Sequence, residues 1–163
     1  MPRDAQRSKV YAAEEFVRKL FDRVDSHASR ALDFFGTSVT LPPEGRFGSV
    51  DAVQRYVDDV LAHPAVRARW PERSPVTVRG RRGESAAHYE WTPDSATIAV
   101  PERQTTWALR ELVVLHELAH HFSQSDPPHG PEFVATFCEL AAAVMGAEVG
   151  YVLRVVYAKE GAR

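Results

Sequence analysis

The sequence predicts a single α+β domain over residues 1–163. Three observations support this class. Several segments repeat apolar residues at helical spacing, two segments between them alternate as strands do, and 44% of the 163 residues are apolar, which is enough to bury a core. We therefore expect one domain in which a small antiparallel or mixed sheet packs on helices.

The first third of the chain predicts two helices with a short β element between them. Apolar side chains within residues 10–24 are three and four residues apart, as on one buried helix face. Residues 51–61 show the same spacing, with Ser49 as a capping residue and His63-Pro64 as the stop. The intervening residues 33–50 mix aromatic and β-branched residues with glycine and prolines, which predicts a strand or two around a turn.

The rest of the chain predicts a sheet followed by helices. Residues 76–78 and 89–100 have extended patterns, and the turn sequence TPDS indicates two antiparallel strands joined at Pro93-Asp94. Residues 107–122 are apolar almost all round, which indicates a helix buried inside the domain. A further helix is expected over residues 131–146, where Gly146 is the terminator, and a last amphipathic helix closes the chain.

Composition limits the classes of function. The 20 basic and 22 acidic residues nearly cancel, so the total charge favours neither a nucleic-acid partner nor an anionic membrane surface. The single cysteine, Cys138, excludes an internal disulfide framework and a cysteine-based metal site, and we expect it in the core. No segment has the pattern of a signal peptide or a membrane span, so we expect a cytoplasmic protein without a membrane partner.

The stretch HELAHHFSQSDPPHGPEF, which begins at His116, predicts a metal centre. His116 and His120 are four residues apart, so on a helix both imidazoles can reach one ion. Glu117 is turned about 100° round the helix axis, where its carboxylate can reach a bound water without becoming a ligand. Such polar residues are costly on a buried helix unless something satisfies them. Metal binding therefore explains this HExxH motif better than a chance arrangement does.

A catalytic zinc ion normally takes three protein ligands, so this motif needs one more. His129 follows a proline-bearing turn nine positions after His120, and Gly130 frees the backbone beside it. Glu139 has the separation found in zinc peptidases with a glutamate ligand, and Asp126 matches a variant of the HExxHxxGxxH pattern. His129 is the favoured ligand because histidine is the commonest one, and Glu139 and Asp126 stay open as alternatives.

Two further roles are less defined by the sequence. His121 points about 100° away from His120, and we expect it to be a solvated surface residue. The group that stabilises an oxyanion has several candidates, each with a structural role as the alternative: Tyr89, Arg103, Tyr151, Arg154 and Tyr157.

HELAHH followed by HGPEF resembles the SprT-like zinc metallopeptidases, whose signature is HExxH, a variable loop and a third histidine in an HGxxF context. This resemblance covers residues 98–140 and implies a zincin-like fold, one zinc ion bound by His116, His120 and His129, and Glu117 as the catalytic base. It also implies that the strand containing Ile98 to Val100 pairs with an extended peptide. The whole chain resembles an actinobacterial family of metallohydrolases without an assigned substrate.

These features predict a zinc-dependent hydrolase, with peptide amide bonds as the favoured substrate and Glu117 as the base that activates water. One alternative is a regulator-cleaving metallopeptidase of the ImmA/IrrE type, with an acidic third ligand at Glu139 or Glu132. Another is a non-catalytic binding module that uses the arginine-rich region 67–82 around Trp70 for nucleic acid or protein. The near-neutral total charge makes nucleic acid a less favoured partner.

Overall fold

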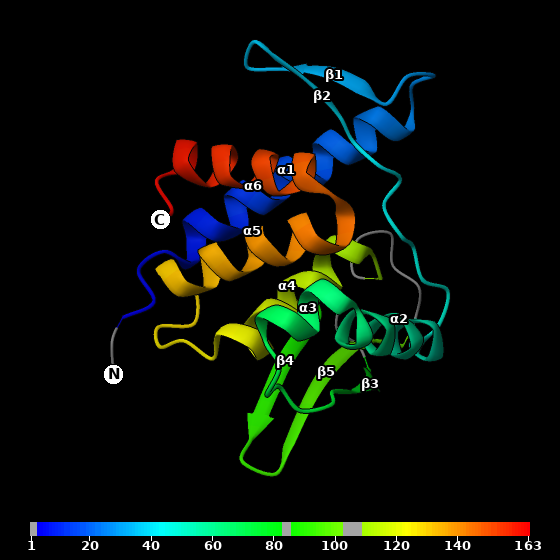
Figure 1. Ribbon diagram of the computed structural model, residues 1–163, viewed down its shortest axis with the longest axis vertical. Helices are drawn as coiled ribbons and strands as arrows, with labels where there is room; N and C mark the ends of the chain where they lie inside the picture. Colours follow the sequence, from blue (N-terminus) through cyan, green and yellow to red (C-terminus); the bar gives the residue numbers. More distant parts are fainter. Residues whose placement is uncertain (1–2, 83–85, 103–108) are drawn as a thin grey trace. The chain divides into compact units, whose positions relative to one another are not determined.

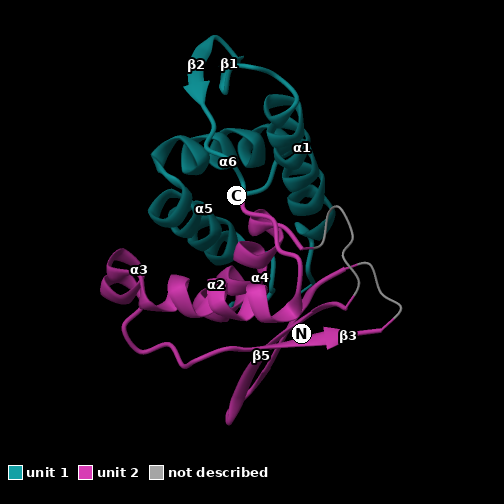
Figure 2. Ribbon diagram, turned by 90° about the vertical axis from the view of Figure 1, so that its right-hand side faces the viewer, with its two compact units in different colours: residues 1–44, 125–163 teal, residues 45–124 magenta. Residues whose placement is uncertain are grey.

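The computed structural model describes residues 3–82, 86–102 and 109–163 (Figure 1). Helices and strands are mixed along the chain, so the predicted α+β class is confirmed. The sequence predicts one domain, and the contacts divide the chain into two compact units (Figure 2). The terminal unit comprises residues 1–44 and 125–163, and the central unit comprises residues 45–124. Among the described residues, every helix is too short or too polar to cross a membrane.

The described residues of the terminal unit form three helices and a β-hairpin. Its elements are α1 (Arg7–Asp25), β1 (Ala31–Phe34), β2 (Thr37–Thr40), α5 (Pro131–Met145) and α6 (Ala147–Glu160). Helix α6 packs against both α1 and α5. Gly150 allows the close approach of α5 and α6, because a Cβ there would lie 2.7 Å from the Cβ of Ala142. The predicted first helix, the β element after it and the last two helices are all confirmed.

Two polar side chains buried in this unit, Tyr157 and Glu14, bond each other. The hydroxyl of Tyr157 donates to Oε2 of Glu14 over 2.6 Å, and both side chains are buried. Burial also raises the pKa of the Cys138 thiol to about 12, so the thiol stays protonated near neutral pH. The prediction of Cys138 as a core residue is confirmed.

The central unit is a mixed sheet with helices packed on it. Its elements are α2 (Val50–Ala62), α3 (Pro64–Arg69), β3 (Thr77–Arg81), β4 (His88–Thr92), β5 (Ser95–Pro101) and α4 (Glu111–Ser123). The strand order is β3-β5-β4, where β5 is parallel to β3 and antiparallel to β4. Helix α2 packs on β3, and α4 packs on β4 and β5. The predicted cap is confirmed, because the Ser49 side chain accepts a hydrogen bond from the Ala52 amide.

The strand with Ile98 to Val100 lies between β3 and β4 in this sheet, so it has no free edge at which the expected peptide could pair. Ile98 lies between Val78 of β3 and Tyr89 of β4 in the register. The outer edge of β3 is capped by Gln54, which bonds the Val78 amide over 2.7 Å and the Val76 carbonyl over 2.9 Å. Among the described strands of this sheet, β4 forms the other edge.

Helix α4 begins at Glu111, and the predicted start at Trp107 lies outside the described residues. The backbone just before the helix is extended and pairs with residues 45–47. The Glu111 amide donates to the Gly45 carbonyl, and the Gly45 amide donates to the Glu111 carboxylate, each over 2.9 Å. These bonds satisfy groups that a helix start leaves open, and they fix the position from which the buried helix departs.

Candidate metal centre

Helix α4 places His116 and His120 on one face, as their spacing predicts. The helix is buried along nearly its whole length, with His116 buried and His120 half-buried. Their Nε2 atoms lie 3.2 Å apart. Two imidazole nitrogens on one tetrahedral zinc ion lie about 3.3 Å apart, given Zn–N bonds near 2.0–2.1 Å. This pair therefore has the separation that a shared ion needs.

Glu117 lies beside this pair and is buried as well, at 6% exposure. Its Oε1 atom is 4.0 Å from Nε2 of His116. Glu117 does not belong to the group of described residues that could hold an ion together. A carboxylate close to the ligands but outside the ligand group matches the position expected of a proton acceptor.

His129 is a buried residue of the terminal unit and stands just before α5. Its Nδ1 is 2.8 Å from Oδ2 of Asp4, and its backbone amide donates to Oδ1 of Asp4 over 3.3 Å. An ionised carboxylate can only accept, so Nδ1 carries a proton, and in the neutral ring the lone pair is on Nε2. The contact joins residues 125 positions apart, and no pattern in the sequence indicates Asp4.

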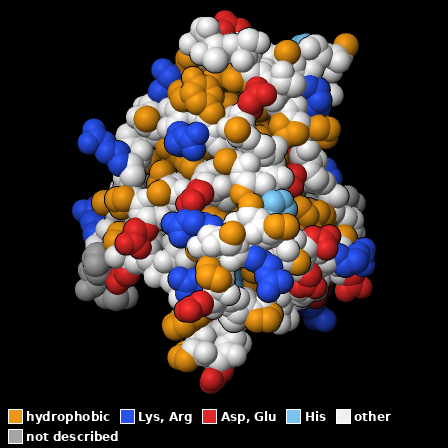
Figure 3. All heavy atoms as spheres, in the orientation of Figure 1, with side chains coloured by type: hydrophobic (Ala, Val, Ile, Leu, Met, Phe, Trp, Pro, Cys, Tyr) orange, Lys and Arg blue, Asp and Glu red, His pale blue; other side chains and the backbone are white. Residues whose placement is uncertain are grey.

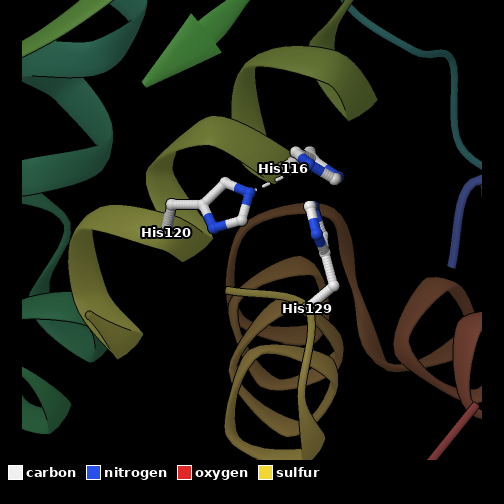
Figure 4. Close-up of side chains that lie close together, drawn as sticks. All are labelled: His116, His120 and His129. Atoms are coloured by element: carbon white, nitrogen blue, oxygen red, sulfur yellow. Dashed lines mark hydrogen bonds between the residues drawn. The ribbon is translucent and has the colours of Figure 1, made fainter. Parts of the chain in front are cut away.

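One ligand atom from each of His116, His120 and His129 lies within 4.8 Å of the other two, and the three rings point toward one another (Figure 4). The acidic alternatives Glu139 and Asp126 are both exposed, and among the described residues neither joins this group. Three imidazoles suit zinc, copper, iron or nickel, whereas calcium and magnesium prefer oxygen ligands. The donor set therefore fits the transition metal that the motif predicts.

The expectation of a solvated His121 is wrong, because this side chain is fully buried. Its Nε2 is 2.8 Å from the Ser74 carbonyl, and its Nδ1 is 2.8 Å from the Tyr89 hydroxyl. A carbonyl only accepts, so Nε2–H donates to Ser74 and the Tyr89 hydroxyl donates to Nδ1 of the neutral ring. Burial lowers the pKa of His121, which keeps the ring neutral.

Tyr89, one of the oxyanion candidates, contacts α4. Its ring stacks on that of His120, with centroids 6.5 Å apart and planes 17° apart. Burial raises its pKa to about 12, and its proton is already donated to His121. In the terminal unit, the hydroxyl of Tyr157, another oxyanion candidate, donates its hydrogen bond to Glu14. Arg103 lies outside the described residues.

The arginine-rich region 67–82 makes local contacts with the protein. Arg69 lies over the Trp70 ring, Arg79 pairs with Glu90 over 2.5 Å, and Arg81 lies 2.6 Å from His88. Basic and acidic side chains are also interspersed over the face drawn in Figure 3. Nothing in this arrangement specifically favours nucleic acid as a partner.

No protein-family model, no curated protein and no solved structure matches this chain. The resemblance to SprT-like metallopeptidases therefore rests on the motif residues alone and stays a prediction.

Proposed function

We propose that this protein is a zinc-dependent hydrolase with peptide amide bonds as its substrate class. The supporting observation is the group of three imidazoles beside a buried carboxylate. His116, His120 and His129 would hold the ion. When bound, zinc would polarise a substrate carbonyl and lower the pKa of a water molecule at the site.

Glu117 is the proposed general base. Its Oε1 atom, 4.0 Å from a ligand nitrogen, can accept the proton of a water molecule as that water attacks the carbonyl carbon. The same carboxyl group can then deliver this proton to the leaving amine nitrogen. Because Glu117 is buried, bulk water does not compete for the proton or screen the charge that develops.

The edge strand β4 supports a peptide as the substrate. Among the described strands it pairs only with β5, and it contacts α4. An extended peptide that pairs with β4 would satisfy main-chain groups on that edge. Tyr89, within β4, stacks on His120, so a chain added along this strand would pass close to the histidine pair.

The first experiment compares wild type with Glu117→Gln for bound metal and for hydrolysis of denatured casein and a fluorogenic peptide mixture. Elemental analysis should find about one zinc ion per chain in both proteins. Hydrolysis by Glu117→Gln should fall by a factor of about 10²–10⁴, the usual contribution of a general base. Loss of metal from this variant would assign Glu117 to the ligands instead.

The matched control is Glu139→Gln, because Glu139 is an exposed glutamate on α5 outside the histidine group. This variant should keep both metal and activity. If it loses the metal, the acidic third ligand of the ImmA/IrrE type is favoured. If wild type binds no stoichiometric transition metal, either as purified or after zinc is added, the proposed function is wrong.

A further inference from the structure

Residues before the first helix hold His129 by its backbone and by its ring. Asp4 accepts hydrogen bonds from both the backbone amide and Nδ1 of His129, at 3.3 and 2.8 Å. The Gln6 side chain donates to the His129 carbonyl over 3.0 Å. The backbone of His129 is thus bonded on both sides by two residues that precede α1.

The ring of His129 is also held in place by two aromatic side chains. The Tyr11 ring meets it edge-on with centroids 5.2 Å apart, and the Phe133 ring does the same at 5.2 Å. Rotation of the imidazole would break the Nδ1 bond to Asp4 and disturb both aromatic contacts. The direction of Nε2 is therefore set inside the terminal unit.

Gln6 and Asp4 hold His129 in different ways. Gln6 also exchanges two bonds with Arg163, in which its Nε2 donates to the Arg163 carbonyl over 2.9 Å and its Oε1 accepts from the Arg163 amide over 2.7 Å. It reaches only the backbone of His129. Asp4 supplies the charged group that bonds the imidazole itself.

We infer that Asp4 is a positioning residue of the metal centre, which orients His129 and strengthens its bond to the ion. This inference rests on the proposed function. A carboxylate on the far nitrogen of a ligating histidine fixes the tautomer, fixes the ring direction and makes the ligand nitrogen more basic. Asp4 has this relation to His129, since its carboxylate binds Nδ1 and the tautomer places the lone pair on Nε2.

The test uses metal-free full-length protein titrated with Co²⁺, followed by visible absorption, and then with Zn²⁺ by competition. Asp4→Asn keeps the size and an accepting oxygen but removes the charge. It should bind Co²⁺ about 10–100-fold more weakly than wild type, and the cobalt absorption bands should shift because the third ligand changes in basicity and angle.

Two control variants separate positioning from general damage. Asp59→Asn removes an exposed charge on α2 and should leave affinity and spectrum unchanged. Gln6→Ala removes the bond from Gln6 to the His129 backbone but leaves the Asp4–imidazole contact. It should therefore lower the melting temperature of the metal-free protein, but it should weaken Co²⁺ binding less than Asp4→Asn does. Equal loss of affinity in Gln6→Ala and Asp4→Asn, with an unshifted spectrum, would assign Asp4 to anchoring alone.

A measurement on wild type covers the case in which Asp4→Asn does not fold. In ¹⁵N-histidine-labelled zinc protein, His129 should show a protonated Nδ1 and a metal-bound Nε2. Metal on Nδ1 would overturn the inference. If wild type binds no Co²⁺, the proposed function fails; if wild type binds it and Asp4→Asn binds equally with the same spectrum, only the role of Asp4 is wrong.

Discussion

His121 and His129 come from the same short stretch of sequence and are both buried, but their surroundings differ. His121, in the central unit, bonds two neutral groups, the Tyr89 hydroxyl and the Ser74 carbonyl, through its two ring nitrogens. His129, in the terminal unit, has a carboxylate on Nδ1 and contributes a ligand atom to the histidine group. Burial alone therefore does not identify a metal ligand. The proposal that His129 binds the ion rests instead on the charge of its partner and on the use of its second ring nitrogen.

The bonds of His121 give it a structural role. They connect α4 to β4 through Tyr89 and to the segment before β3 through Ser74. In the neutral ring both nitrogens are occupied, one as donor and one as acceptor, so His121 has no lone pair to offer an ion.

The largest expected effect is the loss of metal binding in His129→Ala. Removal of one of three ligands should weaken Co²⁺ binding by more than the roughly 10–100-fold typical of residues behind the ligands. His121→Ala should keep wild-type affinity, because both nitrogens of His121 bind protein. Titration of the two metal-free variants with Co²⁺ compares their affinities for the ion. The opposite ranking would exchange the roles assigned to the two histidines.

His121→Ala should instead lower the free energy of unfolding. It removes a fully buried side chain and leaves the Tyr89 hydroxyl and Ser74 carbonyl without their bonds, a loss of about 2–4 kcal/mol. Urea denaturation of the metal-free proteins measures this loss in the free energy of unfolding. The control is His27→Ala, an exposed position, which should change stability by no more than about 0.5 kcal/mol.

The difference in stability between wild type and His121→Ala should depend on pH. Burial lowers the pKa of His121 in the folded protein, while in the unfolded chain it titrates near its ordinary value of about 6.5. Below that value the unfolded chain takes up a proton that the folded protein does not, so folding loses stability as pH falls. The stability advantage of wild type over His121→Ala should be full above pH 6.5 and shrink below it. An advantage that grows in acid would contradict the neutral assignment.

The smallest effect is expected for Tyr89→Phe. This variant removes the donor to Nδ1 of His121 but keeps the ring that stacks on His120. The free energy of unfolding should fall by about 1 kcal/mol, the net value of a typical hydrogen bond. Co²⁺ affinity should stay at the wild-type value. A large loss of affinity would show that the hydroxyl acts on the metal centre and not on His121.

Local patterns in the sequence were sufficient for much of the fold. Helical spacing predicts α1 and α2, Ser49 predicts the cap of α2, and TPDS predicts the turn between β4 and β5; all are confirmed. The HExxH spacing likewise predicts that His116 and His120 share a face, because residues four apart on a helix are neighbours whatever surrounds them. These features depend on residues within a few positions of each other.

Three features were decided by contacts between distant segments. The pairing of β3 with β5 makes Ile98 central, although its own alternation fits an edge strand equally well. Ser74 and Tyr89 enclose His121, whose place on the helix alone predicts exposure. Asp4 reaches His129 across 125 positions. Helical and strand periods report which side chains share a face, but which chain segment covers that face is determined only when the whole chain packs.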